Sequence, residues 1–422
     1  MTLHHEVVNV TDPRWAGGMK LDGVTDDTDA LIAAVHGLPR ARTLGGTRVG
    51  SGILFFPPGV GCLSAVIPAL PSGTRVKGSG RGSTILVQHG VGADMWSFTG
   101  DNASQFYTVF EDIGMVMLEA GGHIFNAAAA EFGHVNWRRC SFSQTNPGKS
   151  IFSMTDGSYI ACELDKSDLT GQPNSTVAMW ACRGRAIASN TWRRLVCTSS
   201  GYWFFELDTD AAVSPYCDGN HFADIDFEET NGGNIKIGSA NGCTIEECDT
   251  YDLQVIGPTT NDLYILTRTG TQPPSIGNKL RRLYRRGGTL GAGLSDIHLI
   301  PAGGAGVNVI DQCNGQIDLG PTSGNTLLAV EGTPVPAANV INRTSDTAEI
   351  SYQHVRSQSL GLWGATPPTA QPAAIAQVAT TAPTQVTPFG FTTAGQFNDL
   401  IAAVNALLSA VGEGTGGYGL TG

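Results

Sequence analysis

Three segments between residues 22 and 86 decide the fold of this chain. They read Asp22-Gly23-Val24-Thr25-Asp26-Asp27-Thr28-Asp29-Ala30-Leu31-Ile32, then Ile53-Leu54-Phe55-Phe56-Pro57-Pro58-Gly59, and then Leu70-Pro71-Ser72-Gly73-Thr74-Arg75-Val76-Lys77-Gly78-Ser79-Gly80-Arg81-Gly82-Ser83-Thr84-Ile85-Leu86. In the first segment, Leu31, Val35 and Leu38 fall on one helix face at i, i+4 and i+7. Carboxylates near the start of such a helix face its positive end, so we expect Thr25 or Asp26 to cap a short helix.

The other two segments predict short strands. Pro57 and Pro58 remove two backbone donors, so the apolar strand before them must end there. The glycines at 78, 80 and 82 allow a tight turn between two further strands. A short capping helix followed by very short strands is how a solenoid begins.

In this order and spacing, the three segments resemble the opening of the pectate-lyase-like family of right-handed parallel β-helices, in the form common in phage tailspikes. That form reads roughly as a GDGVTDDT helix, an FPPG strand end and a GxGxxST turn. This chain has Leu21 where the family has a glycine before Asp22. The resemblance covers residues 22–86 and implies a fold. It implies no reaction, because these residues build the cap and first coils.

The composition agrees with a β-solenoid and limits the partners. The 422 residues include 55 glycines, which suits many short strands and turns, and only 15% are charged. The net charge of −12 argues against nucleic acid or an anionic membrane as partner. No apolar run approaches the roughly 20 residues that span a bilayer, so we expect no membrane insertion. An acidic polysaccharide, if bound, must meet local arginines.

The nine cysteines are scattered and odd in number. We expect small buried thiols in a protein made in the reducing bacterial cytoplasm. Zinc sites need clustered ligands such as paired CxxC motifs, and only Cys243 and Cys248 lie close together in the sequence. We therefore expect no metal and no cofactor. The N-terminal residues also lack the basic, apolar, small-residue order of a secretory signal.

From residue 87 to about residue 320, short β segments recur without a strict period. Each begins at a polar residue or a glycine and carries an aromatic residue, a branched residue or a cysteine at alternate positions. The starting positions are Asn136, Ser158, Asn190, Asn220, Gly242 and Asn278. Their intervals of 22, 32, 30, 22 and 36 residues match one turn of a β-helix with loops of varying length. A β-sandwich would instead show hairpin turns such as Asn-Gly every 8–12 residues, and Asn-Gly pairs are too few for that.

The sequence thus predicts an all-β chain with four segments. We expect an N-terminal arm over 1–21, a right-handed parallel β-helix over 22–320, a Pro/Ala/Thr-rich linker or wrapped tail over 321–395, and a C-terminal helix with a Gly-rich tail over 396–422. The cap and first coils occupy residues 22–86.

The C-terminal helix has the 3, 4, 3, 4 spacing of a coiled-coil seam. Its apolar residues, the candidates for trimerisation, are Phe397, Leu400, Val404, Leu407 and Val411. Two heptads are too short to be stable alone, so the helix is expected either in a homotrimer or packed on its own β-helix. The segment 360–375 before it resembles a C-terminal motif of phage head-fibre and tail-fibre proteins. That resemblance implies a virion appendage and is silent on chemistry.

Glycan cleavage by acid–base catalysis needs two carboxylates. Two clusters, Glu206-Asp208-Asp210 and Asp224-Asp226-Glu228, have the i, i+2, i+4 spacing that puts side chains on one face of a strand. With Ile225 and Phe227 in the interior, the second cluster points outward, and Glu246 can stack beside it one coil later. The candidate catalytic residues are Asp208, Asp224, Asp226, Glu228 and Glu246. The alternative is a solvated acidic face, or partners for the arginine pairs 138/139, 193/194 and 281/282.

Elimination would instead need a basic residue and cations beside an enolate-like intermediate. Arginines are available for that role, although salt bridges account for them equally well. Aromatic faces stack on sugar rings, but most aromatic side chains here must fill the core. The candidate glycan-binding residues are Trp192, Arg193, Arg194, Tyr202 and Trp203.

Together these features predict a homotrimeric spike or fibre on a phage or phage-like particle. Its expected partners are other virion proteins and a polysaccharide of the host surface. Binding alone and depolymerisation both remain open, with hydrolysis favoured over elimination. A cellular pectin-type lyase acting as a monomer is a third alternative, and the C-terminal resemblance counts against it.

Overall fold

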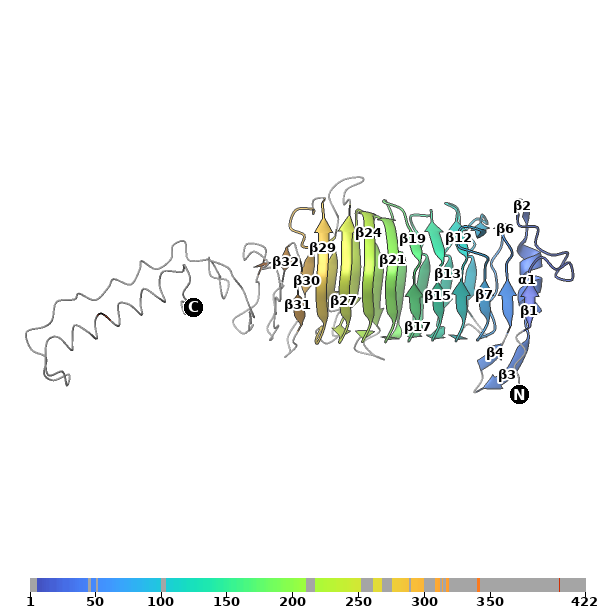
Figure 1. The fold of residues 1–422 in the computed structure, drawn as a ribbon, viewed down its shortest axis with the longest axis horizontal. Coiled ribbons are helices and arrows are strands. Elements are labelled where there is room, and N and C mark those ends of the chain that lie inside the picture. Colours follow the sequence, from blue (N-terminus) through green and yellow to red (C-terminus); the bar gives the residue numbers. More distant parts are fainter. Residues whose placement is uncertain are drawn as a thin grey trace, which may run out of the picture. The chain divides into compact units, whose positions relative to one another are not determined.

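The computed structural model divides into two compact units, residues 1–358 and residues 359–422. It describes residues 6–44, 47–50, 52–99, 104–209, 217–251, 261–267, 275–287, 290–299, 308–311, 313, 316–318, 340–341 and 402. Most of the expected linker, the C-terminal helix and its trimerisation residues therefore lie outside the described residues. The fold below is that of the first unit (Figure 1).

Two large sheets make up this unit among the described residues. The 17-stranded sheet contains β1 (Val7–Asn9), β2 (Asp22–Asp26), β5 (Ile53–Phe55), β6 (Gly59–Leu63), β7 (Arg75–Lys77), β8 (Thr84–Gln88), β11 (Val109–Glu111), β12 (Gly114–Met117), β15 (Asn136–Arg138), β16 (Ser141–Gln144), β18 (Glu163–Asp165), β19 (Asp168–Thr170), β21 (Thr191–Ser200), β24 (His221–Thr230), β27 (Thr244–Tyr251), β29 (Lys279–Arg286) and β31 (Val309–Asp311).

The 14-stranded sheet lies on the other side of the coils. It contains β9 (Trp96–Phe98), β10 (Gln105–Phe106), β13 (Phe125–Ala128), β14 (Glu131–Gly133), β17 (Phe152–Ile160), β20 (Trp180–Ala188), β22 (Trp203–Thr209), β23 (Cys217–Asp218), β25 (Gly233–Gly238), β26 (Ala240–Asn241), β28 (Tyr264–Thr267), β30 (Ile297–Leu299), β32 (Ile317–Asp318) and β33 (Val340–Ile341). A separate antiparallel pair joins β3 (Arg40–Leu44) to β4 (Thr47–Gly50).

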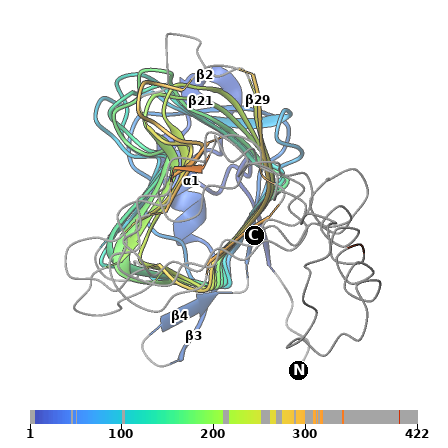
Figure 2. The ribbon, with the colours of Figure 1, turned by 90° about the vertical axis from the view of Figure 1, so that its left-hand side faces the viewer.

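All strand pairs of the two large sheets are parallel, and the chain returns to the same register position once per coil. One such set of partners is Asn136, Glu163, Thr191, His221, Thr244 and Lys279, spaced by 27, 28, 30, 23 and 35 residues. This confirms the predicted parallel β-helix, and Figure 2 shows its coils superimposed in the end-on view.

Three sequence expectations about the coils need correction. Ser158 does not begin a coil, because it lies in β17 and pairs with Glu131 and Ala186 in the other sheet. Residues 7–9, expected in an arm before the β-helix, form β1 and pair with β5. Residues 340–341, expected in the linker, form β33 and pair with β32. Each of these segments has a short apolar or alternating pattern. Such a pattern is compatible with a strand in either sheet, so the sequence alone does not assign it.

Single residues with a positive φ turn the chain between the strand segments of a coil. In one such corner, Arg139, Lys166, Arg194 and Asp224 adopt φ values of 53°, 51°, 55° and 55°. Side chains normally alternate inward and outward along a strand. A left-handed residue interrupts that alternation, so both Phe222 and Ile225, on either side of the corner, are fully buried. This interruption decides where the acids of β24 point.

The core is a column of stacked aromatic side chains with a polar seam of asparagines. Trp192 lies between Phe222 and Tyr159, with ring centroids 4.4 Å and 5.9 Å away. In the seam, Asn190 donates from Nδ2 to Oδ1 of Asn220 at 2.9 Å. Asn278 and Asn308 repeat that contact at 2.8 Å. Each coil buries little surface alone, and these contacts between coils make the core continuous.

Helix α1 (Thr28–His36) lies at the N-terminal end of the stack, as Figure 1 shows. Its predicted apolar face is buried, with Leu31, Val35 and Leu38 at most 2% exposed. Asp26 accepts hydrogen bonds from the backbone N–H and the hydroxyl of Thr28, the first helical residue. No helix among the described residues is long and apolar enough to cross a membrane.

Candidate functional site

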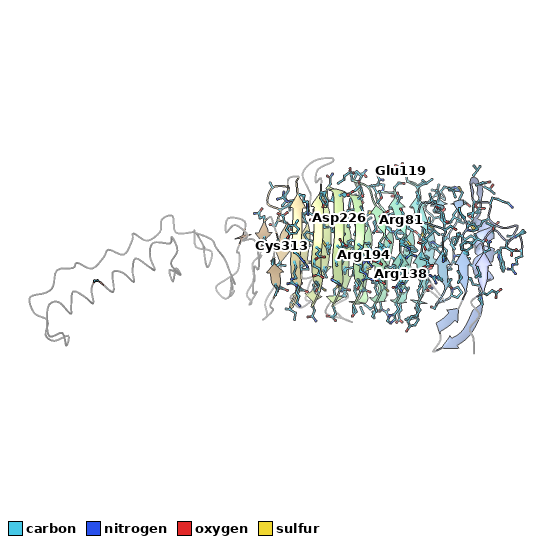
Figure 3. All side chains as sticks on the ribbon, in the orientation of Figure 1. Arg81, Glu119, Arg138, Arg194, Asp226 and Cys313 are labelled. Atoms are coloured by element: carbon cyan, nitrogen blue, oxygen red, sulfur yellow. The ribbon has the colours of Figure 1, made fainter. Side chains whose placement is uncertain are left out.

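After the left-handed corner, strands β21, β24, β27 and β29 present two outward columns of side chains. Strand β19 continues both columns on the preceding coil. We call the first the acid column. Its register partners are Asp168, Val196, Asp226, Asp249 and Tyr284. The second column, two residues further along each strand, holds Thr170, Thr198, Glu228, Tyr251 and Arg286. Figure 3 labels Asp226 on this stack, further toward the C-terminal end than Arg138 and Arg194.

A neighbouring outward column shows what the fold does with charges that serve structure. In register it reads Lys77, Glu111, Arg138, Asp165, Arg193, Ala223, Glu246 and Arg281, and the sign alternates up to the neutral Ala223 and again after it. Opposite charges on neighbouring strands stabilise a sheet, whereas like charges destabilise it. This alternating column therefore needs no function beyond stability.

The acid column breaks that rule at one place. Asp226 and Asp249 face each other on adjacent strands. Neighbouring strands lie about 4.8 Å apart, so two carboxylates meet directly where the alternating column would place a cation. A facing pair of acids costs stability, so we take this pair as the candidate functional site.

The two acids have different surroundings. Burial, followed by the charges of Asp249, Asp224 and Glu228, raises the pKa of the Asp226 carboxyl group. Asp226 has no hydrogen bond or ion pair with the described residues, which leaves its carboxyl group available to a ligand. Asp249 is instead engaged through Oδ2, which accepts a hydrogen bond from the Tyr251 hydroxyl at 2.9 Å and pairs with Arg286 at 2.8 Å.

Two further features define this site. The Arg286 guanidinium lies over the Tyr251 ring, 5.4 Å from its centroid, so one cation and one phenol hold Asp249 together. The other oxygen of Asp249, Oδ1, is buried and accepts no hydrogen bond from the described residues. Buried polar atoms normally have a hydrogen-bond partner. A protonated carboxyl group on the facing Asp226 would be a suitable donor to this oxygen.

Three of the five predicted catalytic residues lie together here. Asp226 and Glu228 share an outward face as expected, and Asp224 is exposed beside them. All three lie on the outside as expected, although Asp224 occupies the left-handed corner and the other two follow it on the strand.

The other two predicted catalytic residues lie elsewhere. Glu246 is in register with Ala223 and not with the acids, and it contacts His221 Nε2 at 2.9 Å. Asp208 lies on β22, in the 14-stranded sheet, in register with Arg183. Its neighbour Glu206 is buried between Arg183 at 2.6 Å and Lys236 at 2.8 Å, which identifies that cluster as an ion-pair network.

The sequence reasoning missed Asp249, Tyr251, Tyr284 and Arg286. A signal for Asp249 existed in the coil intervals. An interval of 22 residues places Cys248 beside Asp226, whereas the true interval of 23 residues places Asp249 there. A slip of one residue exchanges the inner and outer faces of a strand, so the wrong interval hid the second acid.

The prediction that Trp192 and Trp203 stack on sugar rings is wrong. Trp192 is fully buried in the aromatic column, and Trp203 is only 4% exposed. Neither ring offers a face to a ligand, because a β-helix needs large side chains to fill its interior. The aromatic ring with the greatest described exposure is Tyr107, which is 63% exposed and stacks on His134 at 4.9 Å.

The predicted basic contacts are engaged with acids. Arg193 pairs with Asp165 at 3.4 Å and Arg194 with the same carboxylate at 2.6 Å. Tyr202 is half-buried and contacts the edge of Trp203. For these three residues, glycan contact stays a prediction.

The cysteines show no reactive centre in the part of the chain that the structure describes. All nine are free thiols, and eight are buried. Burial raises the pKa of the Cys140 thiol to about 12, which keeps it protonated and unreactive. No group of three or more His, Cys, Asp or Glu residues suited to a metal ion occurs among the described residues.

Comparison with known proteins finds distant structural likenesses and no family. No protein-family model matches the chain, and no curated protein matches it. Among solved structures, the ORF18 protein of Geobacillus virus E2 is similar at 15% identity and a TM-score of 0.47, covering 77% of this chain. This chain spans 61% of the length of that viral protein.

Two further solved structures are similar over most of this chain. The Streptococcus pneumoniae surface adhesin PfbA has 10% identity and a TM-score of 0.45, covering 79% of this chain and 92% of its own. The catalytic unit of the GH87 α-1,3-glucanase of Streptomyces thermodiastaticus has 10% identity and a TM-score of 0.43, covering 83% and 68%. At such identities and scores, none of these likenesses bears on what this chain binds or does.

Proposed function

We propose that this protein is a virion spike or fibre that binds and hydrolyses a polysaccharide of the host surface, with Asp226 and Asp249 as its acid–base pair. The resemblance of residues 22–86 to tailspikes and of residues 360–375 to fibre proteins supports the place in a particle. The hydrolytic part rests on one observation. Asp226 and Asp249 face each other in the acid column, whereas the charges of the neighbouring column alternate in sign. The different surroundings of the two acids suit them to different roles.

Asp226 is the general acid in this proposal. Its raised pKa keeps a proton on the carboxyl group at a higher pH than an ordinary aspartate allows. That proton passes to the glycosidic oxygen while the bond between this oxygen and the anomeric carbon breaks. Asp249 is the second carboxylate, held in place by Tyr251 and Arg286.

The strand spacing predicts the stereochemistry. Neighbouring strands lie about 4.8 Å apart, close to the roughly 5–5.5 Å between the carboxyl groups of retaining glycosidases. Asp249 then attacks the anomeric carbon through Oδ2, since Oδ1 is buried, and forms an ester. In the second step, water attacks the same carbon, gives its proton to Asp226 and releases Asp249. If the enzyme instead inverts the configuration, Glu228, two residues along the strand from Asp226, is the general base that activates water.

Incubation of the purified protein with capsules and lipopolysaccharides of candidate hosts tests this function. We expect shorter chains, new reducing ends and no absorbance from unsaturated uronates, with retained configuration by NMR of the first product. Absorbance from unsaturated uronates would instead indicate elimination. Tight binding without shortening of any bound polysaccharide would contradict the proposed hydrolysis and leave attachment as the function.

A further inference from the structure

The charge around the acid pair is strongly one-sided. Seven carboxylates lie on two neighbouring coils, on β24 and β27. They are Asp224, Asp226, Glu228, Glu229, Glu246, Glu247 and Asp249. The facing positions on the preceding coil are neutral, since Val196 and Thr198 lie opposite Asp226 and Glu228. The site therefore offers many hydrogen-bond acceptors and a negative potential.

The cations described beside these acids already have partners. Arg282 pairs with Glu247 at 2.8 Å, and Arg286 pairs with Asp249 at 2.8 Å. Arg194, which occupies the same left-handed corner as Asp224 on the preceding coil, pairs with Asp165 at 2.6 Å. By contrast, Asp224, Asp226 and Glu228 have no ion pair among the described residues. These three carboxylates therefore give the site a negative charge that no described ion pair offsets.

A ligand at this site meets that charge at short range. Surface charges interact over roughly 8–10 Å at moderate ionic strength, a distance of about two coils. A uronate, sulfate or phosphate group on a bound sugar would lie within that distance of several unpaired carboxylates. Sugar hydroxyl groups, in contrast, are good donors to carboxylates, and Tyr251 and Tyr284 add phenol rings beside Asp249.

We propose that the sugars on both sides of the hydrolysed bond carry no anionic group, so that the substrate is a neutral or amine-bearing glycan at that linkage. This inference rests on the proposed function. It narrows the substrate from any surface polysaccharide to one class, and it excludes polymers with a uronate next to the cleaved bond.

One acidic polysaccharide in two chemical forms tests this choice. Reduction of the uronic acid carboxyl groups to alcohols leaves the linkages unchanged and removes the charge. We expect the reduced form to be hydrolysed at least about tenfold faster than the acidic form, because like charges no longer meet at the site. Added salt is expected to narrow this ratio by screening the repulsion of the acidic form.

A pair of variants separates the local charge from the net charge. Asp224→Lys places a cation at the exposed corner beside the acid pair. We expect it to lower the ratio of the hydrolysis rate of the reduced form to that of the acidic form. Glu131→Lys changes the net charge by the same amount at an exposed position on β14, and we expect the ratio to stay as in the wild type.

Two results would overturn the inference in distinguishable ways. If the acidic form is hydrolysed as fast as the reduced form, or faster, the charge class is wrong while hydrolysis by this protein stands. If neither form of any bound polysaccharide is hydrolysed, the proposed hydrolytic function fails and the inference fails with it.

Discussion

Asp226, the proposed general acid, departs from the alternation of charge in the neighbouring column. Its carboxyl group faces Asp249 across two strands and has Asp224 and Glu228 on its own strand. These neighbours and burial favour the protonated form in the folded protein. A raised folded pKa contributes stability at low pH, and this contribution is lost as the pH rises through the raised value.

Asp226→Asn should therefore stabilise the fold at neutral pH, by a few tenths to about 1 kcal/mol for one like-charge pair removed. The gain should disappear below about pH 4, where an ordinary aspartate is protonated in both states. Thermal unfolding at a series of pH values measures this. Asp168→Asn is the matched control, since Asp168 lies in the same column but pairs with Arg81 at 2.9 Å and should give no gain. A loss of stability in Asp226→Asn at neutral pH would contradict the repulsion.

At the residue scale, the sequence predicts part of the site. Alternation with Ile225 and Phe227 correctly places Asp226 and Glu228 on the outer face. It does not predict the corner at Asp224, because nothing local distinguishes a left-handed aspartate from an extended one. It also fails for Asp249, because the coil interval must be known to the single residue before the facing acid can be identified.

At the scale of strands and coils, hydrogen-bonded asparagines hold neighbouring turns together. Asn220 is fully buried. Its Oδ1 accepts from Asn190 at 2.9 Å, and its Nδ2 donates to the Ile187 carbonyl at 3.1 Å. The sequence pattern identified Asn190, Asn220 and Asn278 as coil starters, and the structure shows why they recur. They satisfy backbone groups where one coil turns into the next.

Asn220→Ala should destabilise the β-helix by at least about 1–3 kcal/mol, because buried donors of Asn190 lose their acceptor. Asn136→Ala is the control. Asn136 is half-buried, and its side chain donates to the His134 carbonyl at 3.2 Å, so a change within about 0.5 kcal/mol is expected. Denaturant unfolding of both variants measures the difference. Equal effects would show that the asparagine seam adds no stability of its own.

At the scale of the whole molecule, the β-helix was predictable from the cap, the proline-stopped strand and the glycine turn of residues 22–86. Its limits were not, since β1 and β33 extend it beyond the predicted 22–320 in both directions. Short apolar segments join a parallel sheet through partners distant in the sequence, and no local pattern reveals those partners.

The proposed spike should be a homotrimer in solution. In the proposed spike, the predicted C-terminal seam from Phe397 to Val411 joins three chains, because two heptads are too short to be stable alone. Light scattering of the full chain measures the mass, and removal of residues 390–422 should weaken the trimer. A stable monomer with these residues intact would contradict the spike.

The most direct test of the whole account is the rate at which Asp226→Asn releases reducing ends from a host polysaccharide that the protein binds. Removal of a general acid should lower this rate by about 10²–10⁴-fold while binding persists. The control Asp168→Asn, in the same column, should stay close to the wild-type rate. A wild-type rate in Asp226→Asn would show that the facing acids of β24 and β27 are not the centre of this molecule's chemistry.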